Sequence, residues 1–378
     1  MNSRPAGLEP KPHFEILDGL RGVAALMVVA FHLCEAHARS PLTQLINHGY
    51  LAVDFFFALS GFVIGYAYDN RWGRMTTWEF VKRRLIRLHP LVILGTLIGA
   101  VCFYFGASVM FPLIHDTPVW KLLLVMLVGF TLVPLLPSMD IRGWAEMHPL
   151  DGPAWSLLFE YVANLLYALV IWKFSRKQLT LFVVVAGVVL LHFGVTSPAG
   201  NFAGGWSVDG TQLHIGFTRL LYPFFGGLLL FRLGKLIRIR HAFWVCSLLL
   251  VAAFALPRFG GAQHAWLNGL YEALCILLLF PLILSLGAGG RLTGRYATPI
   301  CRFLGQISYP IYITHYPLVY IYTAWVTDKY LPLSQVYPYT LLVFFGCLTL
   351  AYASLKLYDE PVRNWLQQRF LPVRTRAN

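Results

Sequence analysis

The sequence predicts an all-α polytopic membrane protein with ten transmembrane helices, a further re-entrant or surface helix, and both termini in the cytoplasm. Of its 378 residues, 57% are hydrophobic and only 12% are charged, whereas charged residues make up about a quarter of a typical soluble domain. Apolar stretches long enough to cross a bilayer recur from one end of the chain to the other. We therefore expect residues 1–378 to form a single membrane-embedded domain.

Eleven apolar segments make up most of the chain, and the positions of Lys and Arg indicate which of them cross. The segments are 20–38, 50–69, 90–108, 120–136, 155–172, 179–196, 214–231, 242–257, 267–287, 303–325 and 337–357. With a cytoplasmic N-terminus and no crossing by 120–136, 24 of the 30 Lys and Arg residues lie on the cytoplasmic side. This is the distribution that the positive-inside rule requires.

Segment 120–136 is the exception among the eleven. It ends at Pro134 and Pro137, and a full crossing there would turn the four later basic clusters outward. A re-entrant or surface helix is therefore expected. The same basic loops explain the net charge of +13, so we expect no nucleic-acid partner. The six cysteines form no CxxC pair, and we expect neither a disulfide framework nor a metal site.

The first helix carries two costly polar residues in the stretch LDGLRGVAALMVVAFH. Arg21 and His32 are eleven residues apart, which at 100° per residue brings them within about 20° of the same helical face and about 16 Å apart along the axis. Ionisable groups in membrane helices usually mark function or a paired contact. Glu35 follows His32 by three residues, so its carboxylate is positioned to orient the imidazole.

The predicted topology gathers the other polar residues in two layers. The outer layer contains His32, Glu35, Asp54, Glu160, Arg219 and Glu272, and the cytosolic layer contains Asp18, Arg21, Arg84 and Arg87. Ser308, Tyr312 and His315, spaced i, i+4, i+7, connect the two. We expect one continuous polar passage. Plainer interpretations remain open: the arginines as topology anchors, a lone His as a packing residue, and His13-x4-Asp18 as a chance match.

Six stretches, in order, resemble the acyltransferase-3 family of integral membrane proteins, which transfer acyl groups, usually acetyl, onto extracytoplasmic sugars and other hydroxyl acceptors. They are LDGLRGVAALMVVAFH with its Arg-x10-His spacing, GYLAVDFFFALSGFVIG, RRLIRLHPL, PAWSLLFEY, SYPIYITHYP and YDEPVRNWL. The resemblance extends over nearly the whole chain, but the hydrolase-like domain fused to longer members is absent from it.

The resemblance implies roles for the polar residues. The donor would be cytosolic acetyl-CoA, a substrate rather than a bound cofactor, held by Arg21, Arg84, Arg87, Ser308 and Tyr312. His32 would act as general base or as acyl-accepting nucleophile, with Glu35 orienting it and Glu160 binding the acceptor. The remaining candidates for substrate binding are Asp54, Trp155, Arg219 and His315.

The expected acceptor is a bacterial surface polysaccharide, an exopolysaccharide or its lipid-linked precursor, and the expected location is the bacterial inner membrane, with the bilayer as a partner. Whether the chain forms a homo-oligomer or works with polysaccharide-assembly proteins stays open. Two alternatives also stay open: a transporter or flippase that uses the polar residues without acyl chemistry, and an assembly protein in which they only pair helices.

Overall fold

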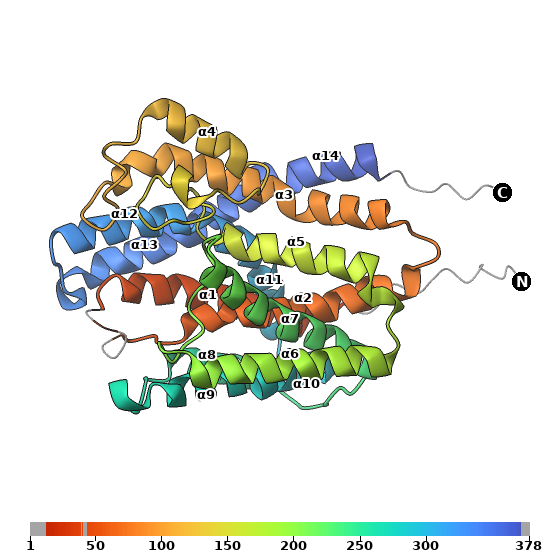
Figure 1. Cartoon of the computed structure of the whole chain (residues 1–378). Coiled ribbons are helices and arrows are strands. Elements are labelled where there is room, and N and C mark those ends of the chain that lie inside the picture. The colour runs from red at the N-terminus through yellow and green to blue at the C-terminus, as the bar shows by residue number, and fades with distance from the viewer. Residues whose placement is uncertain (1–12, 39, 41–43, 372–378) are drawn as a thin grey trace, which may run out of the picture.

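The structure is a computed structural model that describes residues 13–38, 40 and 44–371, and this part of the chain contains helices and no β-strand (Figure 1). The α-helices are α1 (Glu15–Glu35), α2 (Ala52–Tyr68), α3 (Thr77–Cys102), α4 (Val119–Gly129), α5 (Ala154–Leu169), α6 (Arg176–Thr196), α7 (Gly210–Leu233), α8 (Ala242–Ala255), α9 (Trp266–Leu274), α10 (Phe280–Gly289), α11 (Ala297–Thr314), α12 (Tyr316–Asp328), α13 (Leu333–Ala353) and α14 (Glu360–Phe370).

The helices form one bundle in which most axes run in roughly the same direction (Figure 1). Within the described residues, seven helical segments are long and apolar enough to cross a membrane: Glu15–Glu35, Gly49–Arg71, Thr77–Gly106, Arg176–Thr196, Gly210–Leu233, Trp266–Gly289 and Leu333–Phe370. The prediction of a multi-pass helical protein is confirmed at this level. The count of ten spans stays a prediction.

Helix α4 occupies the segment that was expected not to cross. It has 11 residues and is therefore about 16 Å long, roughly half the thickness of the hydrocarbon core. A full crossing by α4 alone is excluded by its length. The helix packs along α3 at one edge of the bundle (Figure 1).

Proline explains the interruptions in two of the predicted spans. Segment 303–325 divides at His315 into α11 and α12, and Pro317 follows in the first turn of α12. Segment 267–287 passes through a π-helical turn, Cys275–Leu279, before α10. Pro281 has no N–H for the carbonyl of Leu277, and the hydroxyl of Tyr222 donates to that carbonyl instead, at 2.8 Å.

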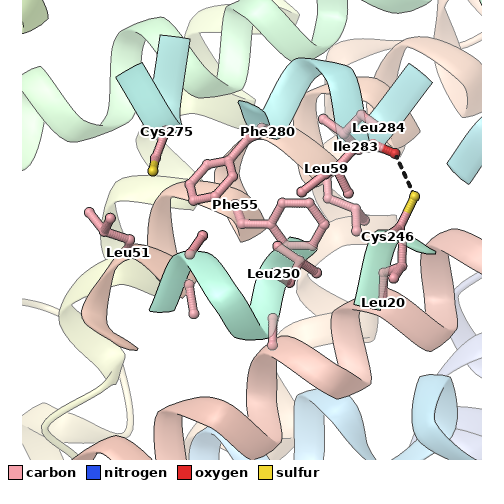
Figure 2. Close-up of a cluster of buried hydrophobic side chains, with 14 of the residues drawn as sticks. Leu20, Leu51, Phe55, Leu59, Cys246, Leu250, Cys275, Phe280, Ile283 and Leu284 are labelled. Carbon is pink, nitrogen blue, oxygen red and sulfur yellow. Dashed lines mark hydrogen bonds between the residues drawn. The ribbon is translucent and has the colours of Figure 1, made fainter. Parts of the chain in front are cut away.

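The centre of the bundle depends on glycines that let helices approach each other. A Cβ added at Gly61 of α2 would lie 1.7 Å from the carbonyl oxygen of Phe224 in α7, and one at Gly227 would lie 1.9 Å from that of Ala58. Small residues at such crossings allow close van der Waals packing. This packing matters in a membrane because the hydrophobic effect does not drive helices together there. Figure 2 shows the adjoining apolar core, where Phe55 packs edge-on against Phe280.

We expect Gly61→Ala to destabilise the protein by about 2 kcal/mol or more, because the α2–α7 crossing would have to separate to admit the methyl group. Thermal unfolding of the purified protein in detergent measures this. Gly346→Ala on α13 is the matched control, since a Cβ there meets no atom within 4 Å. Equal melting temperatures for the two variants would contradict the close crossing.

Candidate active site

Two separate cavities open at the ends of the polar face of α1. One has a volume of about 330 Å³ and is lined by Arg21, Arg87, Arg302 and Arg363 among others; we call it the arginine cavity. The other has a volume of about 480 Å³, and its wall includes His32 and Glu35; we call it the histidine cavity. No residue lines both.

His32 presents a reactive nitrogen to the histidine cavity. Its Nδ1 lies 2.9 Å from Oε2 of Glu35, as the i, i+3 spacing predicts. A carboxylate beside Nδ1 favours the tautomer with the proton on that atom, which leaves the Nε2 lone pair unused. The Tyr316 ring meets the imidazole edge-on at 4.8 Å. The ring is thus oriented from two sides and remains accessible, with 19% of its side chain exposed.

His315 lies behind His32 rather than in the cavity wall. The two imidazoles are stacked with centroids 5.8 Å apart, and His315 is fully buried. Its Nδ1 donates to the carbonyls of Ile311 and Tyr312, both at 2.9 Å, while its Nε2 has no hydrogen-bond partner. This contact supports a role in holding His32, in place of the direct substrate contact expected from the sequence.

Asp54 and Arg219 form a buried ion pair beside the histidine cavity. Nη2 of Arg219 lies 2.7 Å from Asp54 Oδ2, and the two side chains are 2% and 0% exposed. The guanidinium also donates to the carbonyls of Gly204 and Tyr50 and lies over the Trp155 ring at 5.2 Å. Arg219 and Trp155 line the cavity, whereas Asp54 does not; Asp54 therefore supports the wall.

Tyr312 lines the histidine cavity, whereas Ser308, one turn earlier on α11, contacts Arg21 of the arginine cavity. The hydroxyls of Tyr312 and Ser156 are 2.6 Å apart, and Tyr312 lines the histidine cavity. Ser308 instead accepts a hydrogen bond from Nε of Arg21 at 2.8 Å. Tyr312 and Ser308, both predicted to bind the acyl donor, therefore lie beside different cavities.

One arginine of the arginine cavity forms no ion pair among the described residues. Arg21, Arg302 and Arg363 form ion pairs with Asp18, Glu15 and Asp359, respectively. Arg87 is exposed and has no carboxylate partner among the described residues. The start of α1 and the C-terminal helix α14 meet here, so both lie at the same end of the bundle.

Arg84 and Glu160 were expected in different layers, and the structure instead joins them. Nη2 of Arg84 lies 2.5 Å from Glu160 Oε1, which also accepts a hydrogen bond from Ser60 at 2.7 Å. Neither residue lines the two cavities. Together with Ser60, this pair connects α3, α5 and α2. His13 and Asp18, set aside as a chance match, are also in contact, at 3.1 Å.

The two cavities do not form the continuous passage that we expected. Tyr309 lines the arginine cavity and Tyr312 the histidine cavity, so about one turn of α11, roughly 4.5 Å of rise, separates them. Tyr309 donates to the carbonyl of Leu88 at 2.5 Å, and Phe56 packs edge-on against Tyr312. Side-chain packing of this kind cannot be seen in helical periodicity.

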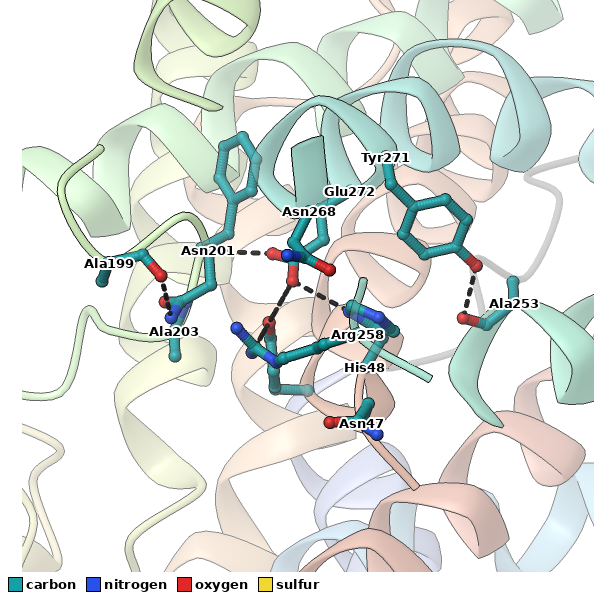
Figure 3. Close-up of polar contacts among 12 residues, drawn as sticks. Asn47, His48, Ala199, Asn201, Ala203, Ala253, Arg258, Asn268, Tyr271 and Glu272 are labelled. Atoms are coloured by element: carbon teal, nitrogen blue, oxygen red, sulfur yellow. Dashed lines mark hydrogen bonds and ion pairs between the residues drawn. The ribbon is translucent and has the colours of Figure 1, made fainter. Parts of the chain in front are cut away.

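Several polar residues that line the histidine cavity were not predicted from the sequence. Tyr50 and Arg258 line it and connect to the buried carboxylate of Glu272, which also lies 2.9 Å from His48 Nδ1 (Figure 3). Glu146, from the α4–α5 loop, also lines it, and burial raises the pKa of this carboxyl to about 7. Loop residues have no periodicity that would single them out.

A metal-dependent centre is not evident in the described part of the chain. No group of three or more His, Cys, Asp or Glu residues there could hold a metal ion. The arrangement instead suits acid–base chemistry at His32 in one cavity and anion binding at the arginines of the other.

Comparison with known proteins identifies the family. The family model described as "Acyltransferase domain" (Acyl_transf_3) matches residues 14–355. "Protein 2 in picA locus" of Rhizobium radiobacter is 35% identical over 189 residues, which are 48% of this chain and 95% of that protein. "O-acetyltransferase OatA" of Staphylococcus aureus is 24% identical over 368 residues.

That second alignment covers 92% of this chain and 57% of OatA, so the chain spans little more than half of that relative's length. No solved structure matches the chain. The family match covers nearly the whole bundle and includes both α1 polar residues and the helices that contact them. The chain belongs to the acyltransferase-3 family of membrane proteins.

Proposed function

We propose that the protein transfers an acetyl group from cytosolic acetyl-CoA to a hydroxyl of an extracytoplasmic carbohydrate in the bacterial inner membrane. The observation that carries this proposal is that one face of α1 contributes residues to a different cavity at each end. Its one face presents Arg21 to the arginine cavity and His32, with Glu35, to the histidine cavity. A phosphate-rich donor and a hydroxyl acceptor need these two environments.

The chemistry follows from the neutral imidazole. Nε2 of His32 removes the proton from the acceptor hydroxyl, and the oxygen of that hydroxyl attacks the carbonyl carbon of the thioester. The carbon–sulfur bond then breaks, and the thiolate of CoA receives the proton from the imidazolium. The products are the acylated acceptor and CoA thiol, with no net proton gained or lost. A route through an acyl-imidazole intermediate uses the same residues in two steps.

The donor would enter through the arginine cavity. Guanidinium groups bind phosphate oxygens through paired hydrogen bonds, and no described carboxylate holds Arg87 in an ion pair. The thioester arm must then pass the turn of α11 between Tyr309 and Tyr312. The distribution of Lys and Arg supports a cytoplasmic location for this cavity.

The acceptor would enter through the histidine cavity. Its wall combines aromatic surfaces such as Trp155 and Trp206 with carboxylates and arginines, a combination suited to sugars. The relative OatA is named an O-acetyltransferase, and we extend that activity to this chain. A surface polysaccharide or its lipid-linked precursor is the acceptor class that we propose.

The experiment is a thiol-release assay. The purified chain in detergent receives acetyl-CoA with extracted cell-surface glycans, and free CoA and glycan mass are followed. Acetylated glycan together with stoichiometric CoA supports the proposal. Intact acetyl-CoA in the presence of glycans from the native cell would contradict it and favour a transporter.

We expect Arg87→Gln to raise the KM for acetyl-CoA about tenfold or more, since a charged hydrogen bond to phosphate contributes roughly 1.5–3 kcal/mol, while kcat changes less. Steady-state kinetics over a range of acetyl-CoA concentrations measures both constants. Arg291→Gln is the matched control, because Arg291 is exposed and lines neither cavity. An unchanged KM in Arg87→Gln would remove this residue from donor binding.

A further inference from the structure

Glu146 is presented to the histidine cavity by a tightly folded loop between α4 and α5. The Asp140 carboxylate accepts hydrogen bonds from the backbone N–H groups of Arg142, Gly143 and Ala145, at 2.9, 3.0 and 2.8 Å. This turn sends Arg142 inward, where it is fully buried, and leaves Glu146 in the cavity wall with 8% of its surface exposed.

The carboxylate of Glu146 has unused hydrogen-bonding capacity. Its two oxygens share one donor, the hydroxyl of Tyr320, at 2.9 and 2.7 Å. An ionised carboxylate accepts about four hydrogen bonds, and Glu146 forms no ion pair with the described residues. The nearby Arg142 is engaged elsewhere: its guanidinium lies over the Tyr320 ring at 3.6 Å and donates to the carbonyl of Pro149.

Aromatic rings connect Glu146 to the reactive histidine. The rings of Tyr320 and Tyr316 meet edge-on at 4.5 Å, and that of Tyr316 meets His32 at 4.8 Å. Trp144, Trp155 and Trp206 line the same cavity. A pyranose has an apolar C–H face, which suits aromatic rings, and a rim of hydroxyl donors, which suits a carboxylate.

The charges of this cavity disfavour an anionic ligand. Arg219 is neutralised by Asp54 at 2.7 Å, and Arg258 lies 3.9 Å from Glu272. The carboxylate of Glu35 is shared only with His32. A ligand that carried its own carboxylate would therefore meet the negative charges of Glu35 and Glu146, the second of which is offset in part by the nearby Arg142.

We infer that Glu146 is a specificity-determining residue of the acceptor site: its carboxylate accepts hydrogen bonds from the hydroxyls of an uncharged pyranose and excludes uronates. The inference rests on the proposed function, in which this cavity receives a carbohydrate.

Binding, rather than turnover, tests the inference. Saturation-transfer NMR on the full chain in detergent measures the affinities of methyl glycosides of glucose, galactose, mannose and N-acetylglucosamine, and of methyl glucuronide and galacturonide. The measurement is made at pH 8, where the carboxyl of Glu146 is ionised, because its pKa is raised by burial to about 7. Because no acyl transfer is needed, failure here is distinct from failure of the thiol-release assay.

We expect at least one neutral glycoside to bind more tightly than both uronides, and Glu146→Gln to weaken that glycoside about tenfold without weakening the uronides. The expected loss reflects the difference between a charged and a neutral hydrogen-bond acceptor. Asp116→Asn is the matched control, since its carboxylate is 84% exposed and outside the cavity. It should change neither affinity.

Tyr320→Phe separates a ligand contact from a structural one. It removes the hydroxyl that donates a hydrogen bond to Glu146, and it keeps the carboxylate of Glu146 and its charge. If Glu146 only stabilises the loop, both variants should lose equal affinity; if it binds sugar, Tyr320→Phe should retain the preference for the neutral glycoside. Absence of glycoside binding by the wild type, or equal affinities in the wild type and Glu146→Gln, would overturn the inference.

Discussion

Replacing His32 by alanine is expected to lower acetyl transfer by about 1,000-fold or more while the protein remains folded and inserted. General-base catalysis alone contributes roughly 10²–10⁴-fold, and loss of a nucleophile would abolish the covalent route altogether. The side chain lines the histidine cavity, so its removal enlarges an existing cavity instead of opening a new one in the core. The thiol-release assay measures the effect, and thermal unfolding confirms that the fold persists.

The control and a second variant sharpen this result. His192→Ala changes an exposed histidine on α6 and should leave the rate unchanged. Glu35→Gln keeps the shape of the partner at Nδ1 but removes its charge, so we expect a fall of about tenfold with an altered pH–rate profile. Normal turnover by His32→Ala would eliminate the proposed chemistry.

The placement of Arg21 and His32 shows what a sequence can predict in a membrane protein. Both residues lie on one continuous helix, so their spacing alone determines their shared face, and the structure places them at the two cavities. The contact of His32 with Glu35 follows from the same local geometry. Local periodicity is reliable because lipid forces the backbone to satisfy its own hydrogen bonds.

Contacts between helices were harder to predict. Arg84 and Glu160 lie 76 residues apart in the sequence, and only the packing of α3 against α5 brings them together. The barrier between the cavities depends on the rotamers of Tyr309 and Tyr312, which no spacing rule describes. The break at His315 was also missed, although Pro317 disfavours an uninterrupted helix there.

The buried pair Asp54–Arg219 is expected to give the largest effect on stability. Arg219→Met leaves the fully buried carboxylate of Asp54 without its counterion, and breaking a buried pair in this way typically costs about 3–5 kcal/mol. The same variant also removes the hydrogen bonds that the guanidinium donates to the carbonyls of Gly204 and Tyr50. We expect a markedly lower melting temperature in detergent.

A double variant distinguishes pairing from a simple loss of packing. Asp54→Leu with Arg219→Met removes both charges, so it should be less destabilising than the sum of the single variants, because neither partner is left buried and alone. Arg240→Met, at an exposed loop position, should melt like the wild type. Strict additivity of the two single changes would show that the charges do not depend on each other. The cavity wall beside Trp155 would then have to be held by the backbone contacts of Arg219 instead of by the ion pair.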